Sequence, residues 1–161
     1  MPEADAACSA GAADAPLHYE VAYSDTDAGG IVYHATYVAM AERSRNHVLR
    51  SLGLPVAEMK ARFNVLFVIR EIRAIYHRPA FVGDMLVLTS GIVSANAVRA
   101  LWRTMVRRGG DRVCEVEAEV AAFSPAAGGP FLIPPDMASL LSHTPRMAPA
   151  RRAPRMNAGQ G

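Results

Sequence analysis

The chain changes from one periodicity to another across the stretch YSDTDAGGIVYH, residues 23–34. Before and into it, residues 17–24 alternate apolar and polar side chains, as a half-buried strand does. After it, residues 35–52 carry apolar side chains at helical spacing, and Gly53 and Pro55 then end the helix. The stretch therefore predicts a strand that delivers two aspartates into a glycine-containing turn at the start of a helix.

The rest of the pattern is built from strands. The clearest one alternates Glu115, Glu117 and Glu119 with apolar residues that point the other way. A single long helix must be covered by an antiparallel sheet of about five strands, so we expect an α+β protein whose sheet wraps around a central helix. The face and edges of the sheet that the helix leaves free would invite pairing with a second subunit. The further strands are expected at about 64–76, 84–95, 97–108 and 112–123.

Composition excludes several classes of protein. The 161 residues fit one domain, and 51% hydrophobic residues fit a globular core. A net charge of +2 gives no electrostatic reason to bind nucleic acid. No run approaches the roughly 18 apolar residues of a membrane span. Two cysteines, and a start without the charged and apolar regions of a signal peptide, favour a cytoplasmic protein.

The two ends of the chain differ from its middle. Residues 1–16 are rich in alanine and lack core-forming side chains, so we expect a disordered arm. Residues 143–161 contain several prolines and arginines and no acidic residue, which predicts a flexible basic tail. The folded domain is expected to span residues 17–142.

The turn and the helix start could together form a catalytic site. A helix N-terminus carries unpaired N–H groups and a partial positive charge, and Gly29 and Gly30 leave the approach to them open. Such a site can hold the oxygen that becomes negative in acyl transfer, while Asp25 or Asp27 acts as nucleophile or as base for water. The same aspartates also suit a purely structural turn. His34, where the helix begins, fits either role.

A metal site is the competing interpretation of Asp25-Thr26-Asp27. The D-x-D pattern also occurs in phosphatases of the haloacid dehalogenase type and in glycosyltransferases, whose carboxylates hold a divalent cation. No second acidic cluster completes such a site here, and the downstream strands lack the βαβ alternation of those folds. The sequence therefore favours a site without a metal.

A longer pattern extends across the turn and the helix. It resembles the signature of hotdog-fold acyl-CoA thioesterases, of the 4-hydroxybenzoyl-CoA thioesterase and YbgC type. The resemblance covers about residues 17–135 and implies the hotdog fold, while the two tails and His77-Arg78 depart from it. The matching residues are Tyr23, Asp25 to Gly30, Val32 to His34, Tyr37, Glu42, Arg43 and Arg45, then Phe67 to Arg70, Tyr76, Pro79, Ala80 and Asp84.

The resemblance implies a role for each matching position of the site. Asp27 corresponds to the catalytic carboxylate, and the backbone N–H of His34 corresponds to the oxyanion donor, with its imidazole available to position the carbonyl or a water. Glu42 would be a second carboxylate near the site or the partner of Arg43 or Arg45. The supporting residues would be Tyr23, Asp25, Gly29, Gly30 and Glu42.

The resemblance also implies a substrate and partners. It implies hydrolysis of short- or medium-chain or aromatic acyl-CoA thioesters, without metal or redox cofactor, in a homodimer or homotetramer whose subunits share the pocket. A protein partner in the cell-envelope machinery follows by analogy. A non-catalytic scaffold that binds acyl-CoA or such a partner is the alternative. Arginines could meet the CoA phosphates, although each also suits a solvated surface: Arg70, Arg73, Arg78, Arg99 and Arg103.

Overall fold

A computed structural model describes residues 15–150 of the chain. Within this part, no helix is long and apolar enough to cross a bilayer. The strands are β1 (Leu17–Glu20), β2 (Leu66–Tyr76), β3 (Met85–Ala95), β4 (Arg99–Arg108), β5 (Asp111–Ser124) and β6 (Gly129–Pro130). The helices are α1 (His34–Ser51), α2 (Val56–Phe63) and α3 (Pro135–Leu141), with a 3₁₀ turn, η1 (Tyr23–Asp25), before α1.

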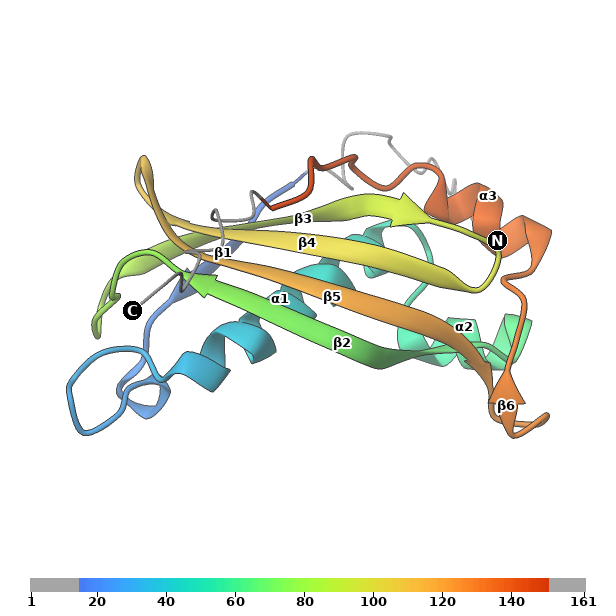
Figure 1. Ribbon diagram of the computed structural model, residues 1–161, viewed down its shortest axis with the longest axis horizontal. Helices are drawn as coiled ribbons and strands as arrows, with labels where there is room; N and C mark the ends of the chain where they lie inside the picture. Colours follow the sequence, from blue (N-terminus) through green and yellow to red (C-terminus); the bar gives the residue numbers. More distant parts are fainter. Residues whose placement is uncertain (1–14, 151–161) are drawn as a thin grey trace, which may run out of the picture.

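The strands form one antiparallel sheet in the order β1-β3-β4-β5-β2, and β6 adds to β5. Helix α1 lies against one face of this sheet, which we call the inner face (Figure 1). The opposite, outer face carries the charged side chains of β5. Strand β2 forms one edge, and its backbone groups on that side have no neighbouring strand among the described residues.

Helix α1 has 18 residues and buries one side of its length. Near its start, Tyr37, Met40 and Ala41 join one apolar cluster with β3, β4 and β5. Near its end, Val48 and Leu49 join a second cluster that includes Trp102 of β4. Burying side chains of this size contributes about 1.5–3 kcal/mol each, so the helix is fixed to the sheet along its whole length.

The structure corrects some of the expected elements. The first strand ends at Glu20 rather than residue 24, because the Asp25 carboxylate accepts a hydrogen bond from the Ala22 N–H and closes a 3₁₀ turn. Helices α2 and α3 were not expected from the sequence. Each is short and buries few side chains, Met59 in α2 and Met137 and Leu141 in α3, so the periodic signal is weak.

The segment after α3 also differs from expectation. Residues 143–150 were expected to begin a flexible tail, yet the Pro145 and Met147 backbones bond to Ile92 at the edge of β3. The segment then crosses the outer face, where Arg103 donates to the Ala148 carbonyl at 2.5 Å. Of the predicted arm and tail, residues 1–14 and 151–161 lie outside the described part of the chain.

Candidate active site

The loop between η1 and α1 is closed by backbone hydrogen bonds. Thr26 and Val32 form an isolated bridge, and the Asp27 N–H donates to the Ile31 carbonyl at 2.9 Å. The Gly30 N–H returns to the Asp27 carbonyl at 3.0 Å, and Gly30 has a φ of 75°, in the left-handed region that favours glycine. The loop is therefore a defined turn that holds Asp27 in one backbone position.

The Asp27 carboxylate is exposed, and within residues 15–150 it accepts one hydrogen bond. Its Oδ1 accepts a hydrogen bond of 2.7 Å from the Gly29 N–H. A Cβ on Gly29 would lie 3.1 Å from that oxygen, so a side chain there would crowd the carboxylate. In the described part of the chain, the second oxygen, Oδ2, accepts no hydrogen bond.

Helix α1 begins directly after this loop. Tyr33 is its N-cap and makes no side-chain cap, and its own N–H donates to the Asp25 carbonyl at 2.9 Å. The first N–H groups of a helix, here starting at His34, have no acceptor within the helix and carry partial positive charge. The exposed His34 ring packs at a tilt on Tyr33, with centroids 4.3 Å apart. Asp27 and this helix start therefore lie at the two ends of one short loop.

Tyr76 connects the end of β2 to the helix start. Its hydroxyl donates to the His34 carbonyl at 3.1 Å, and its ring lies edge-on to Tyr37 at 5.8 Å. Burial raises the pKa of Tyr76. The pKa of Tyr37 is raised to about 12, mainly by burial and to a smaller extent by the nearby Cys114. Both hydroxyls are thus neutral donors at ordinary pH. Sequence reasoning assigned Tyr76 no role, because its partner is 42 positions away.

Asp25 belongs to a different network from Asp27. The Tyr19 hydroxyl donates to both carboxylate oxygens of Asp25 at 3.0 Å, in addition to the bond from Ala22. Burial and Asp25 raise the pKa of Tyr19. The Tyr23 side chain is 85% exposed. Within residues 15–150, no three His, Cys, Asp or Glu side chains are grouped to hold a metal ion.

Glu42 lies on the exposed side of α1. Among the described residues, no ion pair joins it to Arg43 or Arg45 as the sequence suggested. Arg43 instead lies over the Tyr19 ring, 5.8 Å from its centroid. Arg45 is 8% exposed, and burial lowers its pKa while Glu42 partly opposes that effect.

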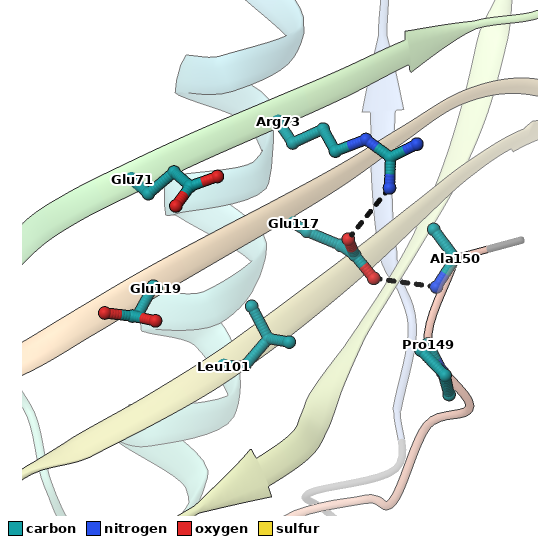
Figure 2. Close-up of a pocket in the computed structure, with 7 residues that line it drawn as sticks. All are labelled: Glu71, Arg73, Leu101, Glu117, Glu119, Pro149 and Ala150. Atoms are coloured by element: carbon teal, nitrogen blue, oxygen red, sulfur yellow. Dashed lines mark hydrogen bonds and ion pairs between the residues drawn. The ribbon is translucent and has the colours of Figure 1, made fainter. Parts of the chain in front are cut away.

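The arginines named from the sequence lie in three different places. Arg70 is exposed at a bulge of β2. Arg73 lies on the outer face, 3.7 Å from Glu117, in a pocket that Glu71 and Glu119 also line (Figure 2). These carboxylates make that pocket unfavourable for a phosphate. Arg99 and Arg103 are on the same face, paired with Glu119 and Glu115, whereas Arg78 follows β2 at the end of the sheet near His34.

Comparisons with known proteins identify the family of the chain. A family model described as "Thioesterase superfamily" matches residues 29–115. The acyl-CoA thioester hydrolase YbgC of Escherichia coli O6:H1 is 35% identical over 115 residues, which cover 71% of this chain and 85% of that protein. The acyl-CoA thioesterase YbgC of Haemophilus influenzae is 26% identical over 123 residues, covering 76% and 90%.

A solved structure shows the same fold. The 1,4-dihydroxy-2-naphthoyl-CoA thioesterase of Synechocystis superposes with a TM-score of 0.71 at 16% identity, over 79% of this chain and 94% of that one. The resemblance read from residues 23–45, and the fold expected from it, are therefore confirmed. The chain belongs to the thioesterase superfamily and has its hotdog fold.

Proposed function

We propose that this protein hydrolyses acyl-CoA thioesters, with short- or medium-chain or aromatic acyl groups, to the free acid and CoA. Family membership and the activity named for the YbgC relatives support this. The observation that carries the proposal is the position of the Asp27 carboxylate. It is exposed, accepts one hydrogen bond from the protein, and lies in a hydrogen-bonded loop that ends at the start of α1. A carboxylate opposite a helix N-terminus suits acyl transfer.

In the proposed mechanism the thioester carbonyl oxygen lies at the first N–H groups of α1, led by that of His34. Asp27 attacks the carbonyl carbon, or removes a proton from a water that attacks it. The tetrahedral intermediate places its negative oxygen at the helix N-terminus, which stabilises that charge. The C–S bond then breaks, and CoA leaves as the thiolate. The thiolate takes up a proton from solvent. After direct attack, water hydrolyses the acyl–Asp27 anhydride.

The remaining site residues have supporting roles in this proposal. Gly29 donates to the carboxylate and Gly30 supplies the positive φ of the loop. Asp25 closes the preceding turn, so its role is structural. The His34 imidazole would orient the carbonyl or a water, while Tyr23 and Glu42 would lie at the margin of the site.

We also propose that the protein is a homodimer or homotetramer. The support is the open edge of β2, because unpaired strand backbone readily pairs with another chain. This edge carries Val68, Ile69, Ile72 and Tyr76, each 40–48% exposed. Ile69, Ile72 and Tyr76 point to the inner face, beside α1, so a second subunit here would enclose the acyl group. Size-exclusion chromatography with light scattering tests this assembly.

The test of activity is a substrate panel. Purified protein and an Asp27→Asn variant would be assayed for free CoA with acetyl-, butyryl-, hexanoyl-, palmitoyl-, benzoyl- and 4-hydroxybenzoyl-CoA. We expect turnover of part of the panel by the wild type and a loss of about 10³-fold in the variant. Saturable binding of acyl-CoA without turnover would contradict the proposal and favour a scaffold that binds acyl-CoA or an envelope-associated protein.

A further inference from the structure

A second pocket lies at the end of the sheet where α1 begins. It has a volume of about 530 Å³, and we call it the arginine pocket. The turn of the β4–β5 hairpin forms one side of it, and the residues that follow β2 form the other. Its lining residues are His77, Arg78, Arg107, Gly110, Asp111 and Arg112.

The pocket holds more positive than negative charge. Arg78 has one weak pair, with Asp111 at 3.8 Å, and both side chains are more than half exposed. Among residues 15–150, Arg107 donates only to the Gly110 carbonyl of its own hairpin, at 3.3 Å. Arg112 donates to Glu115 at 3.1 Å, but Glu115 is also bound by the buried Arg103. The pocket therefore has three guanidinium groups and two nearby carboxylates. Of these carboxylates, Asp111 is weakly paired, and the charge of Glu115 is already balanced by Arg103.

The pocket walls are held in place by backbone hydrogen bonds. The N–H groups of His77 and Arg78 both donate to the Val113 carbonyl, at 2.8 and 3.2 Å. This fixes the segment after β2 against the start of β5. The arginines thus extend from a rigid frame, which lowers the entropy lost when they bind a ligand.

The same segment leads to the proposed catalytic loop. Tyr76, directly before His77, donates to the His34 carbonyl, and the Val32 N–H donates to the Ala80 carbonyl at 2.9 Å. Figure 1 shows the loop before α1, the segment after β2 and the β4–β5 hairpin together at one end of the molecule. A ligand bound across this end could reach both the pocket and Asp27.

We propose that the arginine pocket binds the phosphate groups of the CoA moiety, so that Arg107 and Arg112 join Arg78 as substrate-binding residues. This inference rests on the proposed function. CoA carries a diphosphate and a 3′-phosphate at the far end of a long pantetheine arm from the thioester. Arginine is the side chain best suited to phosphate, since its planar fork donates two parallel hydrogen bonds.

Gly110 offers a test that removes no existing contact. A Cβ at this position would meet no atom within 4 Å, and the residue does not have a positive φ. Gly110→Asp places a carboxylate among the arginines, and Gly110→Asn places a neutral group of the same shape. We expect Gly110→Asp to bind CoA about tenfold more weakly than Gly110→Asn, because one charge-assisted contact has about that value.

The binding measurement is isothermal titration of the full chain with CoA, 3′-dephospho-CoA, pantetheine and inorganic pyrophosphate. We expect the wild type to bind CoA more tightly than pantetheine. The gap, meaning the ratio of the two dissociation constants, should shrink at 300 mM salt because the pocket is open to solvent. Arg107→Gln should reduce the gap about tenfold, with partial recovery in Arg107→Lys. Arg50→Gln, at the exposed far end of α1, is the control arginine.

The outcomes separate this proposal from the catalytic one. Equal affinities of the wild type for CoA and pantetheine, or equal CoA affinities of Gly110→Asp and Gly110→Asn, would overturn the pocket assignment. Pyrophosphate binding that CoA does not displace would overturn it too, and would indicate a separate phosphate site. Phosphate-dependent binding of CoA without hydrolysis of any acyl-CoA would uphold the pocket while the proposed function fails.

Discussion

The two faces of the sheet follow opposite physical rules, and strand β5 shows both. Toward α1 it presents Cys114, Val116 and Ala118, which are at most 4% exposed in an apolar core. Toward the outer face it presents glutamates that pair with arginines on the neighbouring strands. Burial, with a smaller effect of Glu115, raises the pKa of Cys114 to about 12, so even the thiol of the inner face is neutral. The outer pairs are Arg73–Glu117, Arg99–Glu119 and Arg103–Glu115.

This difference indicates where a reactive carboxylate can be found. The outer glutamates bind arginines or the 143–150 segment, as when Glu117 accepts from the Ala150 N–H at 2.7 Å. Asp27, beyond the end of the inner face, has one backbone donor and an exposed side chain. The charges of the outer face are therefore paired within the fold, whereas Asp27, which accepts one hydrogen bond, is the carboxylate we propose for the reaction.

The largest effect on stability is expected from breaking the buried pair of the outer face. Arg103 is 8% exposed and Glu115 3% exposed, and Arg103 also holds Ala148. Arg103→Ala should lower the free energy of unfolding by about 3 kcal/mol, since it leaves a buried carboxylate with weaker partners. Urea denaturation measures this, with Arg99→Ala as the exposed control, where the loss should stay below about 1 kcal/mol.

The next effect concerns the segment that crosses the outer face. A Cβ on Gly91 would overlap the Pro145 carbonyl oxygen and lie 2.8 Å from Cγ of Met147. Gly91→Ala should therefore displace residues 145–147 and cost about 1–3 kcal/mol. Faster proteolysis after residue 143 would report the release. If Gly91→Ala were cleaved in this segment no faster than the wild type, the docking of residues 145–147 against Gly91 would be contradicted.

Tyr76→Phe, at the start of α1 next to the inner face, is expected to have a smaller effect on stability. It removes the hydroxyl that donates to the His34 carbonyl and keeps the ring against Tyr37. We expect a loss of about 1 kcal/mol in stability and about fivefold in kcat, because the first turn of α1 is held less firmly. A Tyr76→Phe variant with the kcat and the unfolding free energy of the wild type would contradict this role of the hydroxyl.

The smallest expected effect is a dependence of the folding stability on pH at the acid end of the range. Burial alone would raise the pKa of Glu115, but hydrogen bonds from Arg103, and then from His77 and Arg112, outweigh it and hold the pKa below its usual 4.5. A lowered pKa in the folded state contributes stability above pH 4.5 that is lost as the pH falls through the folded-state value. The stability gap between wild type and Glu115→Gln should therefore narrow below pH 4.5. A gap that is constant down to pH 2.5 would be inconsistent with this coupling.

The sequence predicted what depends on local periodicity. The helix expected at 35–52 is observed at His34–Ser51, and the four long strands lie within a few residues of their expected ranges. Asp27, Gly29 and His34 could be grouped because they share one short loop. The docking of residues 143–150 could not be predicted, because its partners are Ile92, Arg103 and Glu117, far away in the chain. The same reason hid Tyr76 and the arginine pocket, which the fold assembles from separate strands.

The central claim is that the loop at the start of α1, and not the charged outer face, carries the chemistry. The most direct test is the kcat/KM of Asp27→Asn beside Glu119→Gln, each replacing one carboxylate by an amide, with the best acyl-CoA of the panel. We predict a fall of about 10³-fold for Asp27→Asn and a change below about twofold for Glu119→Gln, both in folded protein. An Asp27→Asn variant that keeps more than a tenth of the wild-type kcat/KM would contradict the account.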